Sequence, residues 1–259
     1  TTQTPQNASG LIDVVNEAGR EEAMTFTNTR ESGTLALSKA LKGNATDGEK
    51  EFTFRVKLEN AQFDTATQRD AYDVVIREAN KADVQTTVAR DANGEYVLTL
   101  KGGQTATLLD VLYGTTATVA EDDYTAEGYE AVSGQTAAVN GQTPDAAVAF
   151  TNERYIGSIE ITKALAGTGS DKGYGKTFTF DVKLWNEHDL DLLNAQTSTM
   201  PSGVDDLTKT NEQRDGHDVY AGTVSITMGA DGQPVSASIT NIPAHTGYEI
   251  VERDYTDDG

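Results

Sequence analysis

The chain has 259 residues, with 41 acidic and 20 basic side chains, a formal net charge of -21 and no cysteine. This charge argues against nucleic acid or an anionic membrane as partner, since phosphate recognition requires clustered Lys and Arg. The absence of cysteine excludes disulfides, zinc–thiolate sites and cysteine nucleophiles together, and no apolar run approaches the roughly 18 residues of a membrane-spanning helix.

The first segment, residues 1–31, begins with a polar stretch that lacks the basic and then apolar layout of a signal peptide. We therefore expect that a leader has been removed or that the chain is an excerpt. The segment ends in Met24-Thr-Phe-Thr-Asn28-Thr-Arg30, which matches Val148-Ala-Phe-Thr-Asn152-Glu-Arg154. Each copy directly precedes a Gly-led strand, so we interpret both as closing strands of a repeated module.

Three further pairs of similar segments occur in the same order in each half of the chain. They are Gly33–Leu41 with Gly157–Leu165, Phe52–Leu58 with Phe178–Leu184, and Thr118–Thr125 with Glu249–Thr256. This repetition predicts one complete module over residues 32–156 and a second over residues 157–259, which lacks its own closing strand. Residues 1–31 would then close a preceding module or, by strand exchange, the second module of another chain.

Period-two alternation of apolar residues, interrupted by Asn-Gly, Asp-Gly and Gly-Gly pairs, predicts strands and turns through both modules. Hairpin tips are expected at Ala92–Glu95 and Gly229–Gly232. Helix should be scarce, although Gln68–Ala79 and Leu190–Met200 could hold a helical turn or an inserted loop. The predicted fold class is all-β, with tandem Ig-like β-sandwiches.

Three polar positions fall on the faces that the apolar residues would bury. Lys39 shares the parity of Leu35 and Leu37, and Lys163 repeats this arrangement after Ile159 and Ile161. The remaining inward positions are Glu121 after Ala117 and Val119, Glu252 after Tyr248 and Ile250, Asn152 after Val148 and Phe150, and Asn28 after Met24 and Phe26.

A buried Lys, Glu and Asn together allow a reaction. Desolvation lowers a lysine pKa and raises a glutamate pKa, so a neutral amine, a carboxylic acid and a carboxamide can coexist. The amine can attack the Asn carbonyl carbon, the acid can transfer protons and ammonia can leave, which yields an isopeptide bond. The plainer alternative is that Lys39 and Lys163 extend to solvent at strand ends and form ordinary salt bridges with Glu121 and Glu252.

These motifs resemble the pilin-type and collagen-adhesin B-type (Cna-B-like) repeats of Gram-positive surface proteins, in particular the domains of streptococcal major pilins that form Lys-Asn isopeptide bonds. The resemblance rests on three segments: Ser-Lys-Ala-Leu-Lys-Gly from residue 38, Gly-Gln-Thr-Ala-Thr-Leu from residue 103, and Phe-Thr-Asn-Glu-Arg from residue 150. The resemblance implies reactive lysines at Lys39 and Lys163, catalytic glutamates at Glu121 and Glu252, and asparagines at Asn152 and Asn28. The second module departs from the pattern, because no Asn follows Glu252 at the required distance.

Other candidate sites are weaker. His188, His217 and His245 lack zinc-helix spacing and are interpreted as surface-loop residues, and the acidic clusters lack EF-hand spacing. We therefore predict no metal, no cofactor and no enzymatic activity beyond self-cross-linking. The stretch 185–214 shows no clean strand pattern and is the best place for an insertion that binds a host matrix protein or glycan, the adhesin alternative.

The expected function is mechanical. The chain is predicted to be a stalk or fibre segment on the extracellular, cell-wall-attached surface of a Gram-positive bacterium, stabilised by Lys-Asn bonds. Its expected partners are adjacent modules or other copies of the chain, with residues 1–31 of one copy completing residues 157–259 of the next and Lys163 bonding the neighbour's Asn28.

Overall fold

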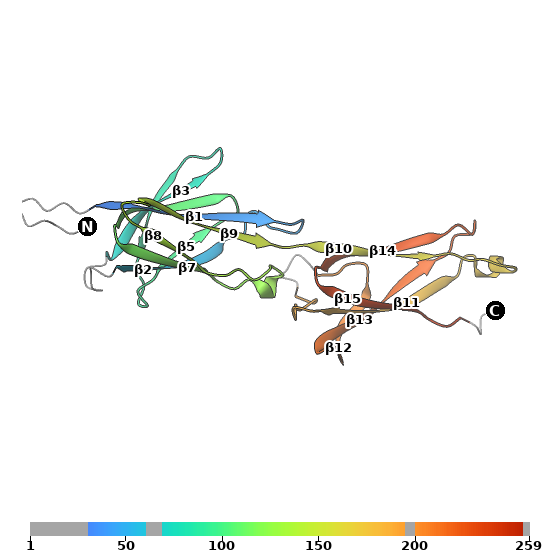
Figure 1. The fold of residues 1–259 in the computed structure, drawn as a ribbon. Helices are drawn as coiled ribbons and strands as arrows, with labels where there is room; N and C mark the ends of the chain where they lie inside the picture. The colour runs from blue at the N-terminus through green and yellow to red at the C-terminus, as the bar shows by residue number, and fades with distance from the viewer. Residues whose placement is uncertain (1–30, 61–68, 195–199, 256–259) are drawn as a thin grey trace, which may run out of the picture.

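The computed structural model describes residues 31–60, 69–194 and 200–255. Almost every element is a β-strand, and the elements form two groups that lie end to end (Figure 1). The prediction of an all-β fold with little helix is confirmed. Among the described residues, no helix is both long and apolar enough to span a membrane.

The first group is a sandwich of two sheets. One sheet has the order β4-β3-β6-β1-β9 and the facing sheet has the order β5-β2-β7-β8. The first sheet contains β1 (Ser32–Lys42), β3 (Ala71–Glu78), β4 (Val84–Ala89), β6 (Gln104–Leu112) and β9 (Asp145–Glu153). The second contains β2 (Phe52–Asn60), β5 (Tyr96–Leu100), β7 (Thr115–Glu121) and β8 (Gln135–Val139), and a 3-10 turn, η2 (Thr125–Glu127), follows β7.

Alternating residues of both sheets form the core of this sandwich. Leu35 and Leu37 on β1 face Phe54 and Val56 on β2, and all four side chains are fully buried. Buried and more exposed side chains therefore alternate along these strands, as the alternation of apolar residues in the sequence predicted. The first and last strands, β1 and β9, pair side by side and parallel, residues 34–42 with residues 145–153, so the two ends of the module lie in one sheet.

The second group repeats this plan with fewer strands. One sheet consists of β10 (Ile156–Lys163) paired with β14 (Val235–Pro243). The other has the order β12-β13-β11-β15, built from β11 (Thr177–Asn186), β12 (Asp205–Arg214), β13 (His217–Thr227) and β15 (Thr246–Glu252), with a 3-10 turn, η3 (Ser170–Gly173), before β11. Within the described ranges, β10 pairs only with β14 and β15 only with β11.

Two stretches expected to be loops or helical turns contain strands instead. Residues 71–78 form β3, and residues 205–214 form β12, so only residues 187–204 of the expected insertion connect strands. The prediction missed β12 because its sequence is almost entirely polar. It is an edge strand with mostly exposed side chains, and such a strand shows no hydrophobic alternation. The described part of Leu190–Met200 contains a turn and no helix.

The two predicted hairpin tips are turns, but the strands that they join belong to different sheets. The turn at Ala92–Glu95 connects β4 to β5, and the turn at Gly229–Gly232 connects β13 to β14. Local turn chemistry predicted the reversal of the chain correctly. It could not predict that the chain also crosses from one layer to the other.

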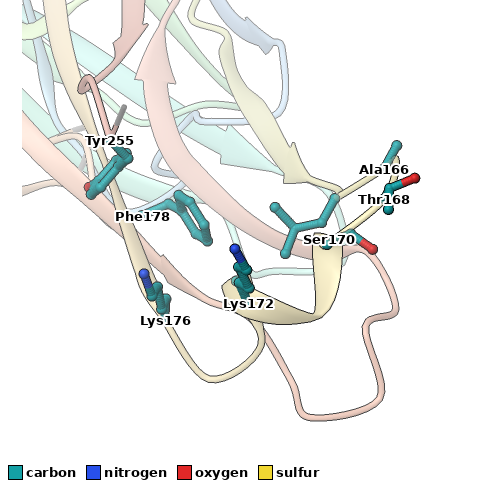
Figure 2. Close-up of a pocket in the computed structure, with 10 residues that line it drawn as sticks. Ala166, Thr168, Ser170, Lys172, Lys176, Phe178 and Tyr255 are labelled. Atoms are coloured by element: carbon teal, nitrogen blue, oxygen red, sulfur yellow. The ribbon is translucent and has the colours of Figure 1, made fainter. Parts of the chain in front are cut away.

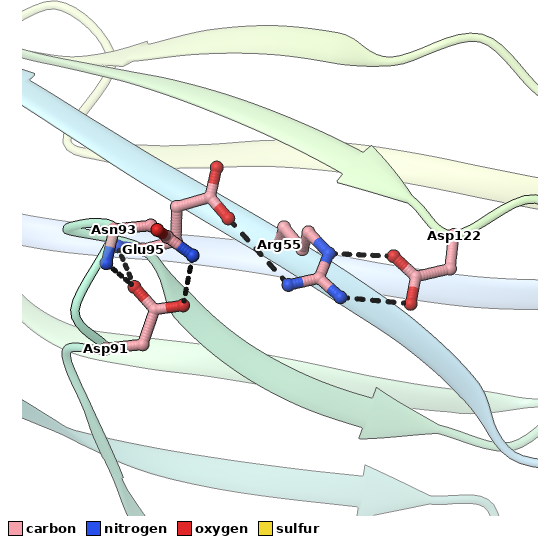
Figure 3. A network of polar contacts seen from close by, with 5 residues as sticks. All are labelled: Arg55, Asp91, Asn93, Glu95 and Asp122. Atoms are coloured by element: carbon pink, nitrogen blue, oxygen red, sulfur yellow. Dashed lines mark hydrogen bonds and ion pairs between the residues drawn. The ribbon is translucent and has the colours of Figure 1, made fainter.

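On the outer face of each sandwich, an ion pair joins the residue directly after the predicted Glu position to the neighbouring strand. In the first module, Arg55 Nε donates to Asp122 Oδ1 at 2.8 Å (Figure 3). In the second module, Arg253 Nε donates to Asp181 Oδ1 at 3.0 Å. The pair thus occupies the same place in both modules with its charges exchanged.

Candidate cross-linking site

Three strands of the first module bring the predicted reactive side chains together. β1 carries Lys39, its parallel neighbour β9 carries Asn152, and β7 in the facing sheet carries Glu121. The register places Lys39 opposite Phe150 and Leu41 opposite Asn152, so Asn152 lies one inward position beyond Lys39. The inward parity predicted for these residues is what points all three side chains into the space between the sheets.

The three polar groups are in direct contact. Lys39 Nζ lies 2.7 Å from Glu121 Oε1 and donates a hydrogen bond to Asn152 Oδ1. The exposed fractions of the Lys39 and Glu121 side chains are 0% and 1%. The amine also sits 3.9 Å from the centroid of the Phe52 ring, which closes the site on its apolar side.

Burial governs the ionisation of this pair. Desolvation lowers the pKa of Lys39 below its ordinary value, while the hydrogen bond and charge of Glu121 act in the opposite direction. Desolvation likewise raises the pKa of Glu121, opposed by the hydrogen bond and charge of Lys39. Both shifts favour the neutral forms, an amine and a carboxylic acid.

One carboxyl oxygen of Glu121 is left without a hydrogen bond inside the sandwich. This oxygen, Oε2, is buried and has no hydrogen-bond partner among the described residues. An unpaired oxygen of a buried carboxylate is costly, and protonation reduces that cost. Chemically, the arrangement contains a nucleophile, a carbonyl and a proton carrier within one dry space.

The second module reproduces only part of this site. Lys163 Nζ contacts Glu252 Oε1 at 2.6 Å and lies 4.3 Å from the centroid of the Phe178 ring, as Lys39 does with Glu121 and Phe52. However, the side chains of Lys163 and Glu252 are 15% and 36% exposed. The predicted partner Asn28 lies outside the described residues.

Side chains on the predicted inward face of β15 are also more exposed than the alternation of the sequence indicated. Tyr248 aligns with the buried Leu184 but is 57% exposed. Its counterpart in the first module, Ala117, is fully buried, since β8 pairs with β7 beside it. The register aligns Tyr248 with a buried position of β11, but burial also requires a neighbouring strand.

A pocket of about 250 Å³ opens at the end of the second module that carries Lys163 (Figure 2). Phe178 and Tyr255, whose ring centroids lie 5.1 Å apart, line it together with Leu165. Lys172 and Lys176 also border it. Sequence patterns do not predict this pocket, because residues 165–178 and Tyr255 come together only in the folded module.

Comparison with solved structures finds partial similarity to pilus proteins. The major pilin from Streptococcus pyogenes is 25% identical, with a TM-score of 0.38 and coverage of 48% of each chain. A pilus-presented adhesin, Spy0125 (Cpa), is 24% identical, with a TM-score of 0.36 and coverage of 48% of this chain and 28% of the other.

Sequence comparison is more informative. A curated pilin from Streptococcus pyogenes serotype M1 is 32% identical over 114 residues, which cover 43% of this chain and 32% of the pilin. The chain thus matches about a third of that relative's length, and the resemblance to pilin-type domains is confirmed. The profile of a family described as a domain of unknown function (DUF7601) matches residues 33–154 and again residues 157–259. With two matches that together span most of its sequence, the chain belongs to the DUF7601 family.

Proposed function

We propose that this chain is a segment of a surface stalk or pilus-like fibre whose modules strengthen themselves by Lys-Asn isopeptide bonds. The observation that carries the proposal is the complete burial of Lys39 and Glu121 in contact with Asn152. An uncross-linked ion pair in such a place costs several kcal/mol of desolvation per ion. A covalent amide removes both the amine and its need for a counter-charge.

The proposed reaction needs no external reactant. The neutral Lys39 amine attacks Asn152 Cγ, and the Glu121 carboxylic acid donates a hydrogen bond to the developing oxyanion. A proton from Nζ passes through Glu121 to Nδ2, the Cγ–Nδ2 bond breaks and ammonia leaves. The product is an Nζ–Cγ amide, and Glu121 ends the reaction in its starting protonation state.

Folding supplies the acceleration by holding amine and carboxamide in contact, which replaces a bimolecular encounter. The resulting bond would join β1 directly to β9, across 113 residues of sequence. Tension applied to the two ends of the module would then pass through a covalent link instead of through the hydrogen bonds between strands. This supports a mechanical role rather than turnover of a substrate, and we propose that the chain is not an enzyme acting on other molecules.

Intact mass spectrometry tests the bond. The purified chain should weigh one ammonia less than its sequence requires, and both Lys39→Met and Glu121→Gln should restore the calculated mass. Glu252→Gln is the matched control and should leave the loss intact. A wild-type chain at its calculated mass would refute the proposal for the first module.

The second module is proposed to form its bond when a closing strand is supplied. Lys163 and Glu252 are already paired, and the outer edge of β10 has no strand partner within the described ranges. A strand of the Phe-Thr-Asn type can add to this edge parallel to β10, as β9 adds to β1. Residues 24–30 of another copy have this pattern, which would link copies head to tail.

Denaturing electrophoresis tests the exchange between copies. Strand exchange predicts a ladder of covalent multimers that Asn28→Ala abolishes and Asn152→Ala preserves. A single monomer band from wild-type chain at high concentration would contradict exchange without affecting the bond in the first module.

The setting is also a proposal. By analogy with the pilin relative, we place the chain on the outer surface of a Gram-positive cell wall, with adjacent modules or copies as partners. The adhesin alternative now depends on residues 187–204, since residues 205–214 belong to a strand. Loss of host matrix or glycan binding upon shortening this connection would support it.

A further inference from the structure

We propose that Glu130, His188 and His245 form a zinc site that joins the two modules. One candidate ligand atom from each residue lies within 4.8 Å of the others. His245 Nε2 is 3.0 Å from Glu130 Oε1, and the His188 ring stacks on His245 with centroids 4.2 Å apart. Glu130 comes from the first module and both histidines come from the second.

Each ligand is attached to a well-defined part of its module. The backbone N–H of Glu130 donates to the carbonyl of Glu153 at 2.9 Å, which ties Glu130 to the end of β9. His188 follows β11, and His245 occupies the turn between β14 and β15. The three residues therefore meet at the junction where β9 ends and β10 begins.

A single buried amide holds both histidine-bearing loops. Asn186 is only 3% exposed, and its Oδ1 accepts a hydrogen bond from the backbone N–H of His188 at 3.0 Å. Its Nδ2 donates to the Ala244 carbonyl at 2.9 Å and to Thr246 Oγ1 at 3.0 Å. The two residues that flank His245 are thus fixed by the same side chain that positions His188, which preorganises the pair.

The turn that carries His245 has an equivalent in the first module. The first module has the same turn, in which Asn60 Nδ2 donates to the Tyr113 carbonyl and to Thr115 Oγ1. The residue at the centre of that turn is Gly114, with φ of 86°, whereas the second module places His245 there, with φ of 59°. The left-handed region favours glycine over any side chain, so the second module carries a histidine where glycine satisfies the shared turn.

The chemistry of the donor set favours zinc. Two imidazoles and a carboxylate match the ligands of zinc sites that leave the fourth position to water. Imidazole disfavours calcium and magnesium, which prefer oxygen ligands. His188 and His245 are exposed, so their side chains can rotate to bring the ligand atoms to the roughly 2 Å distances from the metal that zinc requires. The net charge of -21 further attracts cations.

Zinc at this site would link the two modules at a point separate from the backbone connection between β9 and β10. β9 ends at Glu153 and β10 begins at Ile156, whose N–H and C=O both bond to the Asn44 side chain at 2.9 Å. These contacts lie on the connection between the strands. The Glu130 and histidine contacts add a second point of attachment, so bound zinc would restrict bending between the modules.

Isothermal titration of the whole chain with zinc chloride, after removal of metals with a chelator, tests the site. We expect binding of one zinc per chain. His245→Gly should lower the affinity by roughly tenfold or more while retaining the turn, because glycine occupies this position in the first module. Glu130→Gln should act in the same direction.

His217→Ala is the matched control and should bind zinc like the wild type, since His217 pairs with Asp189 outside the cluster. Calcium chloride should give no comparable binding. Absence of zinc binding, unchanged affinity in His245→Gly, or a stoichiometry of one zinc per two chains would each overturn the proposal. Circular dichroism of each variant establishes that the fold is retained.

Discussion

The two modules place a lysine and a glutamate in nearly the same contact, with Nζ–Oε1 distances of 2.7 Å and 2.6 Å, but in different surroundings. In the first module β9 covers the edge of β1 and β8 covers the edge of β7. In the second, the described residues contain no strand at either edge. The repeated motif therefore positions the pair, whereas the flanking strands exclude water from it.

This difference matters because the proposed chemistry depends on desolvation. The burial that lowers the pKa of Lys39 and raises that of Glu121 arises where sheets and flanking strands enclose the pair. A partly exposed pair keeps hydration that stabilises its charged forms. The comparison predicts that one module reacts on folding and that the other reacts only when its open edge is covered.

Among the variants considered, Glu121→Gln should change the stability of the first module relative to the second the most. The variant should lose the cross-link and leave the Lys39 amine buried without its carboxyl partner, so the first module should lose more than about 5 kcal/mol of stability. Calorimetry that resolves the two modules measures the loss. Glu252→Gln is the matched variant, and a comparable destabilisation of the second module would contradict the contrast.

Lys39→Met should have a somewhat smaller effect. Methionine fills the space without burying a charge, so the loss should approach that of the covalent constraint alone, about 5 kcal/mol for a loop of 113 residues by comparison with disulfides. Thermal unfolding of Lys39→Met beside Lys163→Met provides the measurement. If both variants melt like the wild type, no covalent constraint exists in the first module.

A strand that pairs with the open edge of β10 should make the second module resemble the first in stability and in cross-linking. A peptide with the sequence of residues 18–31, added at about a hundredfold excess over its Kd, should stabilise the second module by about 3 kcal/mol. It should also form an adduct at Lys163 with loss of ammonia. The same peptide with Asn28→Ala should bind without forming the adduct, and a covalent product from that peptide would show that the chemistry has been misassigned.

The smallest effect should come from exchanging the charges of the outer ion pair. Arg55→Asp combined with Asp122→Arg copies the arrangement that Asp181 and Arg253 have in the second module, and should leave the melting temperature unchanged. Arg55→Asp alone should be less stable than the exchange, because the new carboxylate would then lie beside those of Asp122 and Glu95. Equal melting temperatures of the single and double variants would show that this pair contributes nothing.

Much of the first module could be predicted from alternation alone. The inward positions of Lys39 and Asn152 followed from the parity of neighbouring leucines and phenylalanines, and these residues are buried. Edge strands were harder, because β12 has polar residues on both faces and no hydrophobic period. The cross-linking roles themselves stay predictions until the mass is measured.

The sequence by itself determined which side chains face inward, since a strand alternates between its faces whatever it pairs with. The tertiary structure alone decided that β1 and β9 run parallel, that the Phe52 ring closes over Lys39 Nζ, and that Glu130 meets His245, 115 residues further on. These contacts depend on strands and turns that are distant in the chain. Their pairing is set by the packing of whole sheets and not by any local pattern.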